Sequence, residues 1–318
     1  MTSLDLSRLV RLDTVFEQAV AVGDIPGAVV GLTTADGTVY LKAFGYRDRE
    51  AGIAMRDDDI FRTASMTKPV VAATALLLAE EGRLQLGAPV GQYLPELGNL
   101  KLGVEADGKL ALEPSSQPTV FDLLRQTAGF TNVGAGTSLV HAAYAGIASL
   151  RDHQQTNAEL VTKLARLPLL YRPGTTFEYG MSMDVLAAIL EVVAGTDLNR
   201  LVGDRIARPL GMTGTGFLLA DEARLAEPQI DRRTGVRPDL GYQKGRPPRW
   251  FRGGALLGGD GELTGAGQPL QRGDDRPSLR GVHLPRSHGR GQDRVVLDAL
   301  GELEVGAGVA AYLPCFDG

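Results

Sequence analysis

The sequence predicts an α+β fold, and two observations lead to that prediction. Residues 27–48 read as two strands joined at Asp36-Gly37, a dipeptide suited to a tight hairpin turn. Helical patterns then dominate the middle of the chain, without the regular strand-helix alternation of a doubly wound parallel sheet. We therefore expect an antiparallel sheet flanked by helices, together with a mainly helical region spanning about 87–215.

A surface helix is expected before the strands. Apolar residues in 1–24 fall at helical spacing, and charged residues such as Arg8, Arg11 and Glu17 interrupt them. The segment therefore lacks the uncharged core of a signal peptide. No run in the chain approaches the roughly 18 apolar residues of a membrane span. We expect a cytoplasmic protein without a membrane partner.

The stretch "SMTKPVVAATALLLAEEGRLQLGAP" predicts a long helix after the strands. Pro69 falls in its first turn, where a missing N–H is harmless, and Gly82 closes it. The region from about 87 to 180 reads as irregular chain with short helices. Two further helices are expected in "MDVLAAILEVVAG" and "LNRLVGDRIARPLGM".

The composition limits the classes of partner that this chain could bind. The chain has 318 residues, 43% of them hydrophobic, enough for a large buried core. A net charge of -5, with no basic run before the C-terminal fifth, argues against nucleic acid as a partner. The single cysteine, Cys315, excludes an intramolecular disulfide and a multi-cysteine metal site. The sequence does not indicate the oligomeric state.

The C-terminal region, 245–318, differs from 1–244 in amino-acid composition and in hydrophobic pattern. It is rich in Gly, Arg, Asp and Pro, contains no lysine, and shows little helical or strand periodicity before "RVVLDALGELEVGAGVAAYL". We expect this region to fold poorly and to leave the closing strands incomplete. One hypothesis is that the reading frame was lost near its start, which resequencing an independent isolate would test.

Ser65 and Lys68 stand three positions apart at the start of the predicted helix, so they share a face. A serine there lies near the positive end of the helix dipole, and its own N–H can point at an oxyanion. A lysine activates a serine only if burial or nearby cations lower its pKa from about 10.4. The spacing alone favours a helix cap beside a solvated lysine, since serine and lysine are common residues.

The surroundings of these two residues resemble a known family. "TASMTKPVVAATALLLAEEGRLQLGAPV" resembles the nucleophile helix of the serine β-lactamase and penicillin-binding protein superfamily, in particular the class C β-lactamase-like esterases called family VIII carboxylesterases. "GDIPGAVVGLTTADGTVYLKAFG" looks like the family's N-terminal strands, "DLLRQTAGF" like its "LLTHTSGL" segment, and "YRPGTTFEYGMSMDVLAAIL" like its Pro-Gly turn and tyrosine. The resemblance runs from about residue 10 to 220 and implies a β-lactamase-like fold.

The resemblance implies a catalytic role for Tyr179, which follows Pro173-Gly174 and precedes Asp184 as in the esterase branch. A phenol becomes a useful base when a lysine ammonium nearby favours the phenolate. Ser65, Lys68 and Tyr179 would then form one proton-sharing cluster. The alternative is a tyrosine that caps a helix with its ring in the core.

Two departures from the family pattern concern substrate binding. Class C β-lactamases carry an asparagine two places after the tyrosine, where this chain has Met181, which cannot hold a substrate amide. The family's third motif is also missing from its place. His288-Gly289-Arg290 is the nearest string, and it lies in the irregular C-terminal tract.

The sequence therefore predicts a serine carboxylesterase that acts on small or medium acyl esters and needs no metal or cofactor. The alternatives are a β-lactamase or D-alanyl-D-alanine peptidase, an acyltransferase, and a catalytically dead binding protein. A Ser-His-Asp site using His141 or His153 with Asp204 is disfavoured, because both histidines fall in polar, loop-rich sequence and no nucleophile elbow is present.

Overall fold

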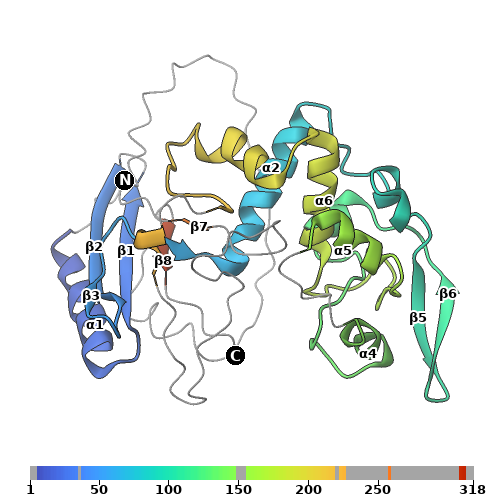
Figure 1. Ribbon diagram of the computed structural model, residues 1–318, viewed down its shortest axis with the longest axis horizontal. Helices are drawn as coiled ribbons and strands as arrows, with labels where there is room; N and C mark the ends of the chain where they lie inside the picture. The colour runs from blue at the N-terminus through green and yellow to red at the C-terminus, as the bar shows by residue number, and fades with distance from the viewer. Residues whose placement is uncertain are drawn as a thin grey trace. The chain divides into compact units, whose positions relative to one another are not determined.

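The computed structural model describes residues 6–34, 37–147, 155–218, 222–226, 257–258 and 308–312. These residues form two compact units, 6–57 with 308–312, and 58–258 (Figure 1). The paired strands among these residues are all antiparallel, and strands and helices do not alternate regularly along the chain, which confirms the α+β class. Most of 245–318 lies outside the described residues. That this region folds poorly therefore stays a prediction.

The first unit contains an antiparallel sheet in the order β3-β2-β1-β8. Its strands are β1 (Gly27–Thr34), β2 (Gly37–Asp48), β3 (Ile53–Ala54) and β8 (Gly308–Tyr312). β1 pairs with β2 from Gly27 opposite Gly45 to Thr34 opposite Gly37, which confirms the expected strand pair. Residue 36 of the predicted turn lies outside the described residues.

A short 3-10 turn, η1 (Leu6–Leu9), leads into helix α1 (Val10–Val22), as the N-terminal pattern predicts. The helix buries Phe16 against the sheet, where its ring stacks on Phe44 with centroids 5.4 Å apart. Gly45 has a φ of +67°, and a Cβ there would lie 2.9 Å from the side chain of Val20. The close approach of α1 to β2 therefore requires glycine at this position.

Helix α2 (Thr67–Glu80) follows strand β4 (Phe61–Arg62) and the 3-10 turn η2 (Ala64–Met66) in the second unit. Gly82, in the left-handed conformation with a φ of +69°, ends it as predicted. The other helical elements are η3 (Val90–Gln92), η4 (Pro95–Leu97), α3 (Val120–Leu124), α4 (Leu139–Ala145), α5 (Asn157–Leu164), α6 (Ser182–Ala194), α7 (Leu198–Val202), η6 (Gly203–Ala207) and η7 (Glu222–Arg224).

A β-hairpin interrupts the region that we expected to be irregular chain with short helices. Strands β5 (Lys101–Ala106) and β6 (Lys109–Pro114) pair antiparallel around Asp107-Gly108. Both turn residues have positive φ, +50° and +70°, as the tightest hairpin turns require. The expectation was therefore wrong for 101–114. Another small sheet pairs β4 with β7 (Leu257–Gly258).

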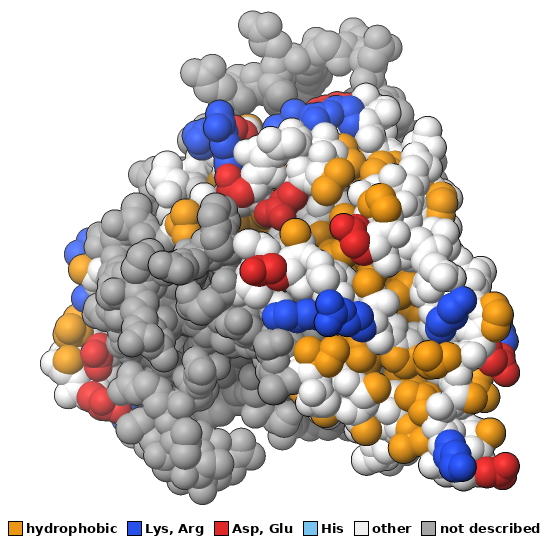
Figure 2. Space-filling model, turned by 45° about the vertical axis from the view of Figure 1, so that its right-hand side comes forward, with side chains coloured by type: hydrophobic (Ala, Val, Ile, Leu, Met, Phe, Trp, Pro, Cys, Tyr) orange, Lys and Arg blue, Asp and Glu red, His pale blue; other side chains and the backbone are white. Residues whose placement is uncertain are grey.

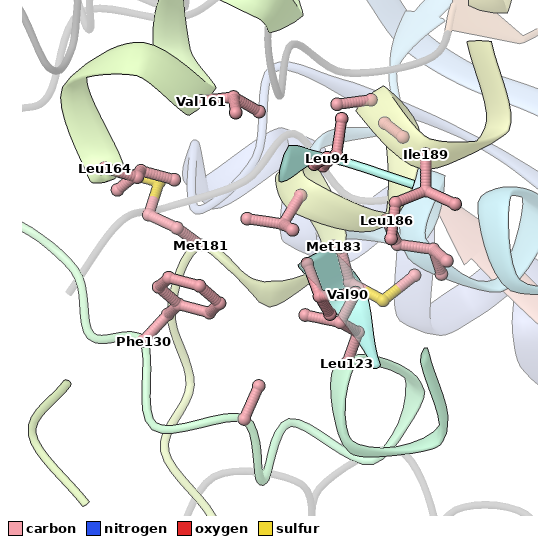
Figure 3. Close-up of a cluster of buried hydrophobic side chains, with 14 of the residues drawn as sticks. Val90, Leu94, Leu123, Phe130, Val161, Leu164, Met181, Met183, Leu186 and Ile189 are labelled. Atoms are coloured by element: carbon pink, nitrogen blue, oxygen red, sulfur yellow. The ribbon is translucent and has the colours of Figure 1, made fainter. Parts of the chain in front are cut away.

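The hydrophobic core of the second unit forms around α6, whose first nine residues are almost entirely buried. Figure 3 shows Met181 beside Phe130 and Leu164, with Leu186 and Ile189 further along the same cluster. A helix that is apolar on every side needs packing partners all round it. α2, α3, α5 and α7 supply them. This packing fixes the position of the chain that enters α6.

Acidic, basic and apolar side chains are interspersed on the face shown in Figure 2, which agrees with the small net charge of -5. Among the described residues, no helix is both long enough and apolar enough to cross a membrane.

Candidate active site

Ser65 lies in the η2 turn, where the chain enters α2, and its side chain is exposed. The Met66 N–H donates to the Thr63 carbonyl at 2.9 Å, which tightens this turn. α2 begins without a side-chain cap, so the hydroxyl of Ser65 is not used as one. The simple cap that the spacing also allowed is therefore not what the structure has.

The three side chains predicted for the site come together. The Ser65 and Tyr179 hydroxyls share a hydrogen bond, and Lys68 Nζ donates to Ser65 Oγ at 3.2 Å. Lys68 Nζ also lies over the Tyr179 ring, 4.6 Å from its centroid. The Tyr179 side chain is 45% exposed, which rules out the alternative of a ring packed in the core.

This arrangement suits proton transfer at Ser65 Oγ. The oxygen of Tyr179 can accept the serine proton when it is a phenolate, and the ammonium of Lys68 is close enough to stabilise negative charge on either oxygen. Among the described residues, no group of three or more His, Cys, Asp or Glu side chains could hold a metal ion. The chemistry available here is that of a hydroxyl nucleophile with an adjacent base.

The segment before Tyr179 is fixed by the Pro-Gly turn. Gly174 has a φ of +81°, and its N–H donates to the Thr127 carbonyl at 2.8 Å. The Glu178 N–H donates to the Gln126 carbonyl, also at 2.8 Å. The segment 126–131 therefore holds the main chain on the N-terminal side of Tyr179 in place. Its match to the family pattern was the only signal of this role in the sequence.

Met181 points away from solvent, with 7% of its surface exposed among the core side chains of Figure 3. The position at which class C β-lactamases carry an asparagine is thus part of the apolar core in this chain. His288-Gly289-Arg290, the nearest string to the family's third motif, lies outside the described residues.

The residues of the disfavoured Ser-His-Asp site are engaged elsewhere. Asp204 forms ion pairs with Arg200 and Arg208 on its own helical segment. His141 Nδ1 is 2.7 Å from Ser138 Oγ, and His141 Nε2 is 3.9 Å from Glu178 Oε1. His153 lies outside the described residues.

Comparison with known proteins gives a family match over most of the chain. The family described as Beta-lactamase matches residues 12–268. Esterase EstB of Burkholderia gladioli is 34% identical over 288 residues, covering 85% of this chain and 70% of EstB. Lovastatin esterase of Penicillium rubens is 30% identical, covering 80% of this chain and 61% of that protein.

Solved structures of related enzymes agree. EstCE1, described as a hydrolase with promiscuous acyltransferase activity, has a TM-score of 0.65 at 28% identity and covers 81% of this chain and 71% of its own. Simvastatin synthase LovD of Aspergillus terreus has a TM-score of 0.65 at 26% identity, and the match covers 81% of this chain and 66% of LovD. The chain spans 59% to 70% of the first curated relatives it matches. By the family match and the identity to EstB, this chain belongs to the β-lactamase family.

Proposed function

We propose that this chain is a serine carboxylesterase of the family VIII type, which cleaves small or medium acyl esters through an acyl-enzyme on Ser65. The observation that carries the proposal is the convergence on Ser65 Oγ of the Tyr179 hydroxyl and the Lys68 ammonium. Two groups that can hold a proton meet an exposed serine hydroxyl at the start of a helix.

In the proposed acylation step, Ser65 Oγ attacks the ester carbonyl carbon while its proton passes to the phenolate oxygen of Tyr179, whose negative charge the Lys68 ammonium stabilises. The tetrahedral intermediate then collapses, the bond to the leaving oxygen breaks, and the same proton goes to the departing alcohol. The Ser65 N–H, at the start of α2, is one donor for the oxyanion. No metal or cofactor takes part in this step.

Deacylation repeats the sequence with water as the nucleophile. Tyr179 takes a proton from water as the water oxygen attacks the acyl carbon, and the proton returns to Ser65 Oγ when the acid leaves. The related proteins support esters as the substrate class, because EstB and lovastatin esterase are both named as esterases. We therefore propose a small-molecule ester as the physiological partner, and not nucleic acid.

An acyltransferase is the second candidate function. It is favoured by EstCE1, whose description includes promiscuous acyltransferase activity, and by LovD, a simvastatin synthase. The chemistry differs only in the second step, where an alcohol replaces water. Product analysis with a p-nitrophenyl ester and added short alcohols separates the two, since transfer yields a new ester and hydrolysis yields the free acid.

The proposed function is tested by assaying p-nitrophenyl esters beside a chromogenic cephalosporin, with Ser65→Ala as the matched control. We expect ester hydrolysis that disappears in Ser65→Ala, and no cephalosporin hydrolysis, because Met181 cannot hold the substrate amide. A fluorophosphonate probe should label Ser65. Labelling that persists in Ser65→Ala would reject Ser65 as nucleophile, and a chain that neither hydrolyses nor labels would be a binding protein.

The hydrolase domain is proposed to comprise 1–244, with 245–318 as a distinct C-terminal region, although the family match extends to residue 268. Trypsin digestion with mass spectrometry tests this boundary: the sequence predicts early cleavage at Arg272, Arg280 or Arg290 and a resistant fragment that ends before them. A cytoplasmic location is likewise a prediction, which cell fractionation with an antibody tests.

A further inference from the structure

Tyr179 stands in a segment that belongs to no helix or strand, between the Pro-Gly turn and the start of α6. Nearly half of its side chain is exposed. A tyrosine in such a segment has many orientations open to it, but the proposed chemistry needs its hydroxyl at Ser65 Oγ. Some group must therefore hold the main chain of this segment in one conformation.

Gln126 bonds to the main chain on both sides of Tyr179. Its carbonyl accepts the Glu178 N–H at 2.8 Å, and its side-chain Oε1 accepts the Gly180 N–H at 3.3 Å. The glutamine is 7% exposed, so these bonds are shielded from water. Two anchors, one residue before and one residue after, fix the backbone dihedrals of Tyr179.

The backbone of Gln126 has a φ of +58°, in the left-handed region. A residue with a Cβ is strained there, and glycine or asparagine is the usual occupant. A glutamine in this conformation is a cost that the surrounding structure must offset. Its main-chain carbonyl and its side-chain amide both reach the Tyr179 segment in this conformation.

Other residues of the segment 126–131 contact Glu178 and Gly180, the two neighbours of Tyr179 in sequence. Glu178 Oε1 accepts the Thr131 hydroxyl at 2.6 Å, while a Cβ on Gly180 would lie 2.5 Å from the carbonyl oxygen of Phe130. The side chain of Glu178 is thus turned toward 126–131, and the ring of Tyr179, next in sequence, is turned toward Ser65 and Lys68.

We propose that Gln126 is a positioning residue, which holds the hydroxyl of Tyr179 at Ser65 by anchoring the main chain on both sides of the tyrosine. Its hydrogen bonds to this segment go to the main chain of Glu178 and Gly180, so its effect on catalysis is through Tyr179. The proposal rests on the proposed function, because the positioning matters for catalysis only if Tyr179 is the base.

Gln126→Asn gives the sharpest test. The side chain is one methylene shorter and cannot reach the Gly180 N–H, while asparagine tolerates a left-handed backbone better than glutamine. We expect the melting temperature to stay the same or rise, while kcat on a p-nitrophenyl ester falls about tenfold to a hundredfold with little change in KM. A purely structural residue would not lower kcat while stability is kept.

Gln126→Glu and Gln126→Met complete the series. Glutamate keeps an oxygen at the same reach and should restore most of kcat, whereas methionine keeps the length without an acceptor and should behave like asparagine in kcat. The matched control is Thr127→Val. Thr127 is the next residue and is equally buried. The substitution removes its side-chain hydrogen bond of 3.1 Å to Asp122 and keeps its main-chain carbonyl, which accepts the Gly174 N–H.

The position of Tyr179 can also be measured by fluorine NMR, independently of enzyme activity. In protein labelled with 3-fluorotyrosine, the resonance of Tyr179 is assigned by its loss in Tyr179→Phe. We expect it to shift or broaden in Gln126→Asn and Gln126→Met but not in Thr127→Val. An unchanged resonance in both Gln126 variants, or an equal kcat loss in Thr127→Val, would overturn the proposal.

The two proposals fail in different ways. A wild-type chain that is inactive on esters and unlabelled at Ser65 would reject the proposed function, while the fluorine resonance would still decide whether Gln126 positions Tyr179. An active wild-type enzyme with wild-type kcat in Gln126→Asn and Gln126→Met would reject the positioning role alone.

Discussion

The ammonium of Lys68 lies over the face of the Tyr179 ring, with Nζ 4.6 Å from the ring centroid, while it donates to Ser65 Oγ. One cation therefore contacts both the nucleophile and the base. A cation over an aromatic face is attracted by the ring, and more strongly when that ring carries negative charge. The lysine is placed to favour the state in which the serine proton has moved.

Lys68→Ala should lower the acylation rate by about two or more orders of magnitude, the scale of assistance that a positioned proton-transfer group gives. The fast release of p-nitrophenol in stopped-flow measurements reports this step directly. Thermal unfolding of the variant checks that the fold is kept. A Lys68→Ala enzyme that acylates at close to the wild-type rate would mean that the lysine is structural.

Tyr179→Phe keeps the ring under Lys68 and removes the hydroxyl that bonds to Ser65. We expect the melting temperature to be preserved and turnover to fall by about a hundredfold or more, because the proton acceptor is gone. Steady-state kinetics beside circular dichroism measure the two effects separately. Wild-type turnover in this variant would show that another group is the base.

Gly180→Ala should be both destabilising and damaging to activity. The new Cβ would meet main-chain atoms of Phe130 and Thr131 at 2.5 to 2.8 Å, and backbone cannot move aside as a flexible side chain can. Overpacking of this kind costs about 1–3 kcal/mol. Urea unfolding measures the loss. Gly87→Ala is the control, since a Cβ there meets nothing within 4 Å and should change stability by less than about 0.5 kcal/mol.

Met181→Asn should destabilise the protein without creating β-lactamase activity. The side chain lies in the apolar core, where an amide without partners costs about 1–3 kcal/mol. Urea unfolding and a cephalosporin assay measure the two outcomes. The control is Val192→Asn on the same helix, where the side chain is 57% exposed. Cephalosporin turnover in Met181→Asn would show that this position does face the substrate.

Glu191 should make stability depend on pH. Burial raises the pKa of its carboxyl above the ordinary value of 4.5, against the opposing hydrogen bond of 2.9 Å from the Leu198 N–H. A raised folded-state pKa means that the native state holds its proton when the unfolded state has released it. The stability from this group is therefore present below the unfolded-state pKa and is lost as the pH rises through the folded-state value.

Glu191→Gln keeps the acceptor oxygen and cannot ionise. We expect wild type and variant to be equally stable at pH 4, and the variant to be the more stable at neutral pH. Urea unfolding across this range tests the difference, with Glu96→Gln on the exposed η4 turn as the control. A variant that is less stable at every pH would contradict the effect of burial.

β1 and β2 could be predicted because the apolar stretches in 28–32 and 39–44 flank an Asp-Gly dipeptide. The same signal at Asp107-Gly108 marks β5 and β6, and Leu102, Val104, Leu110 and Leu112 alternate with other residues around it, so this hairpin could have been predicted from the sequence and was missed. β6 is almost wholly exposed, so its apolar side chains do not mark the core of the unit.

Ser65 and Lys68 could be paired from the sequence, because residues three positions apart on a helix lie on the same face. Tyr179 is 114 residues from Ser65, and only the family resemblance linked them. Gln126 could not be recognised at all, since its role depends on a left-handed backbone and on a bond to Gly180, 54 residues away. Neither feature has a signature in residue type.

Val29 of β1 pairs with Tyr312 of β8, almost the full length of the chain away. β1 is a central strand of its sheet, with β2 on its other side. During synthesis β1 and β2 leave the ribosome early, but this pairing cannot form until residues 308–312 have been made. The first unit therefore has a high contact order, which predicts slow folding and a nascent chain that carries an open, aggregation-prone strand edge until then.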